Sequence, residues 1–171
     1  MNIDTARLTL GPVAAEDHAE LYALFTQPGV RRFVFDDQVL APDAITDIVG
    51  RSVELFRTRH FGLWLARRKA APSAATPPVG FGAFWYFREP PELELLYGVA
   101  DAEVGRGYGR EIARAVVDYG FTGLAMAEVR ASTDSSHMAS RRLLEAIGFT
   151  FERQAVVGGL DTAFYVSRNA Y

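Results

Sequence analysis

Residues 99–110 read Val-Ala-Asp-Ala-Glu-Val-Gly-Arg-Gly-Tyr-Gly-Arg, and a helical run begins at once with Glu111. An extended segment therefore leads into alternating glycines, and the glycines open a helix. Such a turn exposes several backbone N–H groups at the positive end of a helix dipole, which favours a bound anion such as a phosphate or diphosphate. A cation there costs about 0.3–1 kcal/mol, so Arg106 and Arg110 make better physical sense with a phosphate between them.

Hydrophobic periodicity predicts the elements on either side of this loop. We expect strands at residues 3–11, 61–68, 79–87, 92–100, 127–133, 149–157 and 162–168, and helices at residues 15–26, 43–59, 107–124 and 138–147. The strand–helix–strand unit from residue 92 to residue 133 implies one parallel pair with a right-handed crossover. The sequence thus predicts a mixed α/β (α+β) fold, with a mostly antiparallel twisted sheet of about seven strands and helices on both faces.

Two connecting segments have distinctive compositions. Residues 31–37 form a polar and aromatic stretch that we interpret as a loop between the first two helices. Residues 70–78 are rich in alanine and proline, which is typical of a low-complexity connector. Gly148 is expected to cap the helix before it, and Gly158 with Gly159 to turn a final hairpin.

The bulk composition fits one globular domain over residues 1–171. No apolar run is long enough to span a bilayer, and the first residues lack a secretory signal, so we expect a cytoplasmic protein and no membrane partner. The net charge of −3 argues against a nucleic-acid partner, which needs a basic face. With no cysteine and only 3 scattered histidines, neither a thiolate nucleophile nor a metal site is expected.

Four features in this order and spacing resemble one known family. They are Thr5-Ala-Arg-Leu-Thr-Leu, Glu94-Leu-Leu-Tyr, Val104-Gly-Arg-Gly-Tyr-Gly, and His137-Met-Ala-Ser140 followed by a helix that ends Ile147-Gly-Phe149. Together they resemble the GNAT superfamily of acyl-CoA-dependent N-acyltransferases, most closely the branch of ribosomal-protein N-terminal alanine acetyltransferases. On spacing alone the glycines would fit a ligand-free turn equally well, whereas Walker-type and dinucleotide-binding sites fit poorly.

The resemblance implies a cofactor site. It assigns the CoA diphosphate to Gly105, Gly107 and Gly109 with the N–H groups of Arg106, Tyr108 and Arg110. It also implies a splay beside Tyr97 and Val99, where free backbone groups would pair with the pantetheine arm and the Val99 N–H would polarise the thioester carbonyl. Two positions depart from the family pattern: Val104 replaces Gln, Arg or Trp, and His137 replaces an Asn that caps the helix and touches the cofactor.

The same resemblance suggests catalytic and acceptor residues, each with a structural alternative. Glu94 interrupts a strand that should be apolar, so it is a candidate general base or a substrate-binding carboxylate. The resemblance places the Ser140 hydroxyl near the cofactor sulfur or the diphosphate, although a helix-terminus hydrogen bond would also explain this residue. In the segment that covers the acceptor in relatives, Asp36 and Asp37 are candidates to hold an ammonium; Phe33 and Phe35 either contact the acceptor or anchor the segment in the core.

We therefore expect an N-acetyltransferase that uses acetyl-CoA as cosubstrate and no metal. A neutral primary amine, on a protein N-terminus or a small molecule, would attack the thioester directly without a covalent acyl-enzyme. The alternatives are an acyl-CoA-binding or regulatory module of the same fold with little turnover, and a binder of another nucleotide. An edge strand in the C-terminal hairpin makes a homodimer possible.

Overall fold

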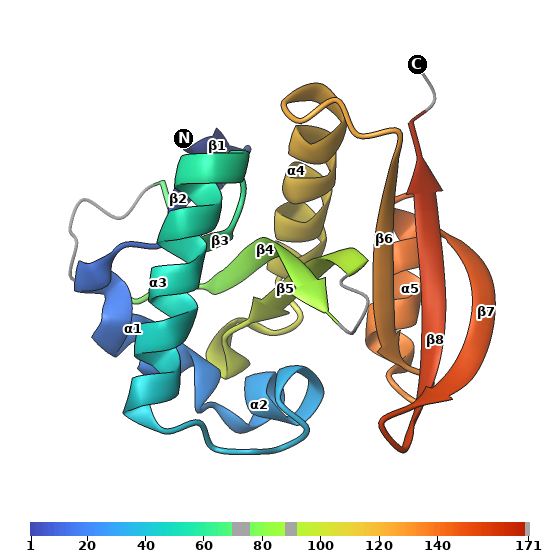
Figure 1. The fold of residues 1–171 in the computed structure, drawn as a ribbon, viewed down its shortest axis with the longest axis horizontal. Coiled ribbons are helices and arrows are strands. Elements are labelled where there is room, and N and C mark those ends of the chain that lie inside the picture. Colours follow the sequence, from blue (N-terminus) through green and yellow to red (C-terminus); the bar gives the residue numbers. More distant parts are fainter. Residues whose placement is uncertain (70–75, 88–91, 170–171) are drawn as a thin grey trace.

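The computed structural model describes residues 1–69, 76–87 and 92–169, and one sheet runs through them (Figure 1). The sheet has 8 strands in the order β1-β2-β3-β4-β5-β6-β8-β7. The strands are β1 (Ile3–Asp4), β2 (Leu8–Pro12), β3 (Leu63–Arg68), β4 (Gly80–Phe87), β5 (Glu92–Val99), β6 (Glu128–Asp134), β7 (Thr150–Val157) and β8 (Leu160–Arg168). All neighbours are antiparallel except β5 and β6, which confirms the predicted fold class and its single parallel crossover.

The strand predicted over residues 3–11 is two strands, which accounts for the additional member of the sheet. Thr5 turns the chain: its N–H donates to the Leu8 carbonyl (2.9 Å), and its hydroxyl accepts from the Leu8 N–H (2.8 Å). A threonine that satisfies nearby backbone groups in this way competes with a continuous ladder. The result is a hairpin in which Ile3 lies opposite Leu10.

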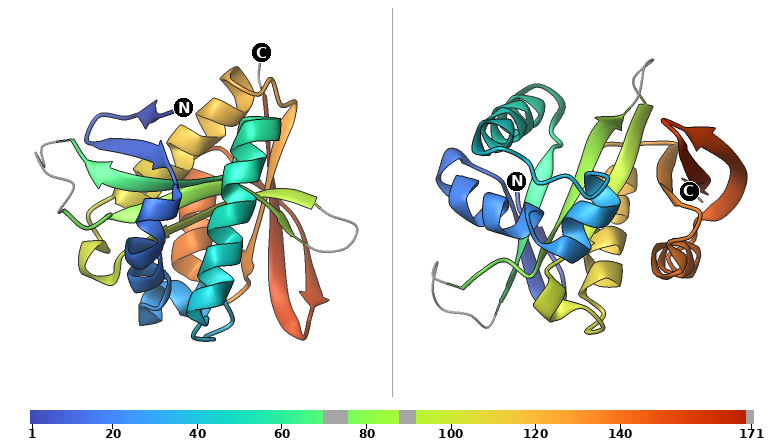
Figure 2. Two further views of the ribbon diagram at one scale, coloured as in Figure 1. Left: turned by 60° about the vertical axis from the view of Figure 1, so that its left-hand side comes forward. Right: turned by 90° about the horizontal axis from the view of Figure 1, so that it is seen from below.

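Helices cover both faces of the sheet (Figure 2), and a separate hydrophobic core lies between the helices and the sheet on each face. The helices are α1 (His18–Phe25), α2 (Pro28–Val34), α3 (Pro42–Arg59), α4 (Tyr108–Thr122) and α5 (Met138–Ala146). Strand alternation divides the cores: Leu63 and Leu65 join the cluster under α1, α2 and α3, whereas Trp64 and Ala66 join the one under α4 and α5.

The prediction of a loop at residues 31–37 is wrong in its first part, because residues 31–34 belong to the helix α2. Gln27-Pro28-Gly29 does end the preceding helix, but Pro28 is also the first residue of the next one. Proline suits that position because its N–H would have no helical partner there and its φ is already helical. Asp36 and Asp37 then follow in the left-handed conformation, with φ of 52° and 62°.

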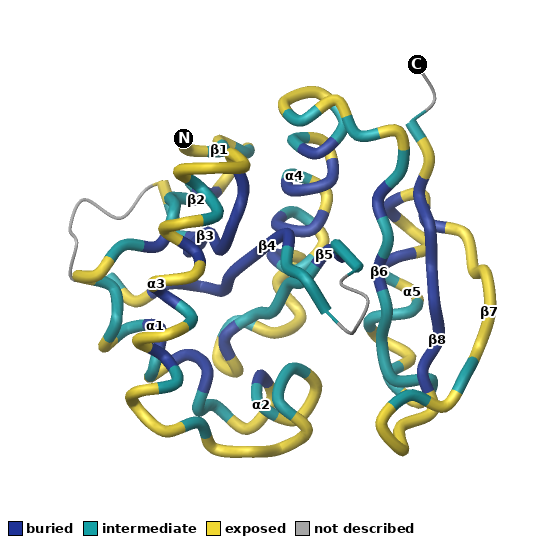
Figure 3. The backbone as a smooth tube through the Cα atoms, viewed as in Figure 1, coloured by how far each residue is buried: buried dark blue, intermediate teal, exposed yellow. Residues whose placement is uncertain are grey.

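The C-terminal hairpin forms as expected. Gly158 and Gly159 have φ of 58° and 85° between Val157 and Leu160, and Gly148 caps α5 with φ of 98°. β7 is the edge strand, and its residues are mostly exposed whereas β8 is mostly buried (Figure 3). Pairing of this edge with a second copy stays a prediction. Most of the predicted connector, residues 70–75, lies outside the described residues.

The N-terminal hairpin is tied to the first turn of α4 by Glu111. One carboxylate oxygen of Glu111 accepts from the Thr5 hydroxyl (2.6 Å) and the Arg7 N–H (2.8 Å), and the other accepts from Arg7 Nε (2.7 Å). Arg7 also donates to the Arg106 carbonyl (3.0 Å), inside the glycine loop. Two residues of the Thr-x-Arg motif therefore fix the start of α4.

Replacement of Glu111 by Gln should lower the melting temperature by about 2–4 °C, on the order of 1 kcal/mol for a chain of this length. Burial alone would raise the pKa of Glu111, but the bonds from Thr5 and Arg7 together lower it below the usual 4.5. The stabilisation is therefore complete above that value and is lost as the pH falls through the lowered pKa. Thermal unfolding from pH 7 to pH 3 should show the two proteins converging in acid.

Glu54→Gln is the matched control for this measurement. Glu54 also pairs with an arginine, Arg57 at 2.7 Å, but both side chains are more than half exposed on α3. An exposed pair contributes little to stability. An equal loss in the two variants would contradict the anchoring role of Glu111.

Candidate active site

β5 and β6 part at the centre of the sheet, and this opening organises the site. Among the described residues their parallel pairing is registered at Glu94 opposite Arg130, and Figure 1 shows the strands diverging. On its other edge β5 stays paired with β4 as far as Val99, and the Ala100 N–H donates to the Val79 carbonyl (2.9 Å). Because successive N–H groups point to opposite edges of a strand, the Val99 N–H faces the opening.

The glycine loop follows β5 and presents its backbone. Gly105 and Gly107 have φ of 83° and 80°, which L side chains rarely adopt. The N–H groups of residues 105–110 donate to no hydrogen bond among the residues the structure describes; Glu111 is the first that does, to the Gly107 carbonyl (3.2 Å). A Cβ at Gly109 would lie 3.2 Å from Val99 Cγ2, so this glycine lets α4 pack close to β5.

The side chains of the loop lie away from this row of N–H groups or brace it. Tyr108 is buried, with the guanidinium groups of Arg7 and Arg68 at 4.5 and 5.7 Å from its ring centre. Arg68 also pairs with Glu103. Val104 is 68% exposed, so its departure from the family pattern leaves the backbone of the loop intact. Arg106 and Arg110, which we predicted beside a phosphate, are both exposed at the start of α4.

Tyr97 and Ser140 meet at the same opening, from β5 and from the first turn of α5. The phenol oxygen lies 2.8 Å from Ser140 Oγ. Burial raises the pKa of Tyr97 to about 12, although the bond to Ser140 opposes the shift, so the phenol stays protonated at neutral pH. The sequence contains no tyrosine within α5, and the structure brings one there from the neighbouring strand.

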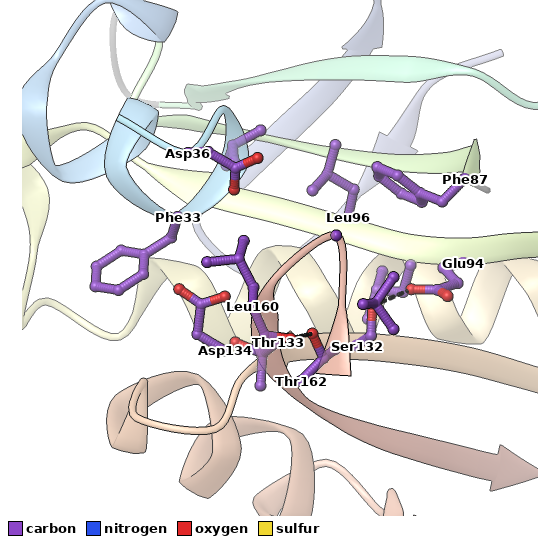
Figure 4. A pocket seen from close by; sticks show the side chains of 14 residues that line it. Phe33, Asp36, Phe87, Glu94, Leu96, Ser132, Thr133, Asp134, Leu160 and Thr162 are labelled. Atoms are coloured by element: carbon purple, nitrogen blue, oxygen red, sulfur yellow. Dashed lines mark hydrogen bonds between the residues drawn. The ribbon is translucent and has the colours of Figure 1, made fainter. Parts of the chain in front are cut away.

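Glu94 lies in a pocket of about 300 Å³ on the face covered by α2 (Figure 4). The residue is only 3% exposed, and its carboxylate accepts a hydrogen bond from Ser132 Oγ (2.6 Å). The rest of the lining comes from α2, the end of β4, β5, β6 and the final hairpin: Phe33, Val34, Asp36, Phe87, Leu95, Leu96, Thr133, Asp134, Val157, Gly158, Leu160 and Thr162. A carboxylate at the base of a mixed polar and apolar pocket can bind an ammonium or accept its proton.

The structure divides the four acceptor candidates into two pairs. Phe33 and Asp36 line the pocket. Phe35 packs in the core against Phe25, with ring centres 5.0 Å apart, and Asp37 lies outside the pocket lining and pairs with Arg31 (3.0 Å). The sequence alone could not show which two of the four line the pocket, because the segment was predicted as a loop and a loop has no regular pattern of side-chain directions.

His137 is the N-cap of α5 but makes no side-chain capping bond. Its ring stacks instead on Phe33, with centres 3.7 Å apart and an angle of 14° between the planes. Burial lowers its pKa, an effect that Asp134 opposes and Arg32 reinforces. The imidazole is therefore mostly neutral at pH 7, and it links α2 to α5 across the opening.

No group of three or more metal-ligating side chains occurs within the described parts of the chain. A search of the same residues finds no helix long and apolar enough to cross a membrane.

Comparisons with known proteins agree with this geometry. Residues 7–150 match the acetyltransferase (GNAT) domain model. An uncharacterized N-acetyltransferase of Bacillus subtilis, YoaA, is 24% identical over 151 residues, or 88% of this chain and 83% of that protein. A putative GNAT-family acetyltransferase from Bordetella pertussis has the same fold, with a TM-score of 0.81, 19% identity, and 98% and 99% of the two chains covered.

RimL, the ribosomal L7/L12 alpha-N-protein acetyltransferase, was solved in complex with coenzyme A and is also similar in fold. Its TM-score is 0.81 at 13% identity, with 98% of each chain covered. The domain match spans most of the chain, and the resemblance of its sequence motifs is thereby confirmed. The chain belongs to the GNAT acetyltransferase family, whose common activity is acyl-CoA-dependent acetyl transfer.

Proposed function

We propose that this chain transfers an acetyl group from acetyl-CoA to a primary amine by direct attack of the amine on the thioester. The observation that carries the proposal is the opening between β5 and β6. A row of free N–H groups, a protonated phenol and a buried carboxylate all border it. Each of these groups suits one part of that reaction.

The glycine loop fits the diphosphate of CoA. The N–H groups of residues 105–110 have no hydrogen-bond partner among the described residues, and they lie at the N-terminus of α4, where the helix dipole favours an anion. A Cβ at Gly105 would meet nothing within 4 Å, so the space beside this part of the backbone is open. RimL binds coenzyme A on the same fold, which supports CoA over another nucleotide.

Acetyl-CoA supplies an acetyl thioester, whose C–S bond breaks as the C–N bond forms, so that the products are an amide and CoA. Glu94 takes the proton that the amine must lose, directly or through water; a free alkylamine has a pKa of about 10.4 and is mostly protonated at neutral pH. The Val99 N–H stabilises the negative charge that develops on the carbonyl oxygen. Tyr97, joined to Ser140, donates a proton to the departing sulfur, and the second proton that the nitrogen loses as the amide forms returns to the phenol.

The first test of this function is ligand-induced stabilisation with acetyl-CoA, CoA, ATP and NAD side by side. A ligand at a hundredfold excess over its Kd stabilises the native state by about 2.7 kcal/mol, so CoA and acetyl-CoA should each raise the melting temperature by several degrees. Gly107→Asp should abolish this shift, because it places a carboxylate beside the free N–H groups. Gly159→Asp is the matched control for cofactor binding, since Gly159 has a similar φ of 85° and lies in the final hairpin, outside the glycine loop.

A shift with ATP or NAD alone would reject the CoA site. A shift with acetyl-CoA but no product from any amine would instead identify a binding module.

Glu94→Gln should lower kcat by about 10²–10⁴-fold, the usual contribution of a general base. Its residual rate should keep rising with pH, because the amine must then lose its proton to solvent. Steady-state rates from pH 6 to pH 10 test this, with Glu92→Gln as control: Glu92 lies on the same strand and outside the described lining of the pocket. A wild-type rate in Glu94→Gln would leave Glu94 as a binding carboxylate or a structural one.

Tyr97→Phe should lower kcat by about 10-fold and change the KM for acetyl-CoA little, because the hydroxyl acts on the leaving sulfur. Ser140→Ala should act through the same bond, so the double variant should lose less than the product of the two single losses. The pKa of about 12 also predicts no loss of rate from Tyr97 ionisation below pH 10. If the loss of kcat in the double variant equals the product of the two single losses, Tyr97 and Ser140 act independently and the proposed coupling is wrong.

A further inference from the structure

The pocket beside Glu94 has a second acidic end. Figure 4 shows Asp36 and Asp134 near Phe33 at one end, and Glu94 near Phe87 at the other. The two aspartates come from opposite walls, since Asp36 follows α2 and Asp134 ends β6. The pocket therefore presents carboxylates at both ends, with apolar side chains such as Leu96 and Leu160 between them.

Neither aspartate is neutralised by an ion pair with a side chain that the structure describes. His137 lies close enough to Asp134 for the carboxylate to act on its pKa, but burial keeps the imidazole mostly neutral at pH 7. Arg32 lies over the Phe33 ring, 5.2 Å from its centre, and does not line the pocket. Both carboxylates are thus available to a ligand.

The wall that carries Asp36 is held at both ends of α2. At its start, the Gly29 N–H donates to Asp101 Oδ1 (3.1 Å), and the Gln27 side chain accepts from the Asp101 N–H (2.8 Å). At its end, Phe33 stacks on His137. These contacts join α2 to both sides of the opening, so the spacing between the acidic walls is set before a ligand binds.

We propose that the acceptor is an amine with a second cationic group, and that Asp36 and Asp134 hold this second charge while Glu94 receives the reacting amine. The inference rests on the proposed function and adds the charge class of the substrate. A hydrogen bond between charged groups is stronger than one between neutral groups, so the second cation should raise kcat/KM by about 10-fold, which corresponds to about 1.4 kcal/mol. A carboxylate at the same place should lower it.

The experiment compares three amines of equal length, namely pentylamine, diaminobutane and aminopentanoate, which place a methyl, an ammonium and a carboxylate at the far end. The series is repeated with shorter and longer chains to match the span of the pocket. We expect kcat/KM to fall in the order diamine, monoamine, amino acid, after correction for the two reactive ends of the diamine. Acetyl-CoA is held at saturation, so the differences report acceptor recognition.

Asp36→Asn and Asp134→Asn should each remove most of the preference for the diamine, so that within each variant kcat/KM for the diamine falls toward kcat/KM for the monoamine. Asp118→Asn is the matched control, because it makes the same change of charge on the exposed face of α4. A general loss of folding would lower kcat/KM for all three amines together and would also reduce the stabilisation by acetyl-CoA.

The outcomes separate the inference from the function beneath it. A wild-type enzyme that acetylates monoamine and diamine equally at every length, or a diamine preference that survives both substitutions, would overturn the inference and leave the acetyltransferase function standing. No product from any amine, with stabilisation by acetyl-CoA intact, would overturn the amine-acetyltransferase function and the inference with it.

Discussion

The parting of β5 and β6 is the constraint on which the rest of this structure depends. Backbone groups inside a sheet normally find partners in the next strand, and buried groups without them are costly. Here the parallel pairing is registered at Glu94 opposite Arg130 among the described residues, while β5 remains fully paired with β4 on its other edge. A ligand that supplies hydrogen-bond partners along the opening can therefore bind as an additional strand would, without displacing an existing one.

The opening also explains why distant parts of the chain are fastened around it. The N-terminal hairpin reaches across the sheet through Thr5 and Arg7 to hold Glu111 and the Arg106 carbonyl. This contact fixes the start of α4, so the free N–H groups keep their orientation when no anion is bound. An array of N–H donors that is already in place loses less entropy when it binds an anion. A glycine-rich loop can therefore hold its donors in a defined geometry even though glycine itself is flexible.

The sequence predicted those parts of the site that depend on local order. Strand, alternating glycines and helix are contiguous, and Glu94 is a charged residue in an apolar strand, so the sequence alone identifies both as candidates. Contacts between distant residues were not found: Tyr97 and Ser140 are 43 positions apart, and their approach requires the crossover to be built. Phe33 and Phe35 could not be separated either, because the sides to which they point are set by the helix α2, which has only 7 residues and no repeating apolar pattern.

His137 shows how a departure from the family pattern fits this particular chain. An asparagine at an N-cap would bond to the first turn of α5, and the imidazole does not. The ring instead covers Phe33, a large aromatic that is still 38% exposed, and so ties α2 to the far side of the opening. The helix exchanges a local capping bond for a tertiary contact. Because α2 and β6 carry opposite walls of one pocket, this contact links the geometry of that pocket to the end of α5 where Ser140 lies.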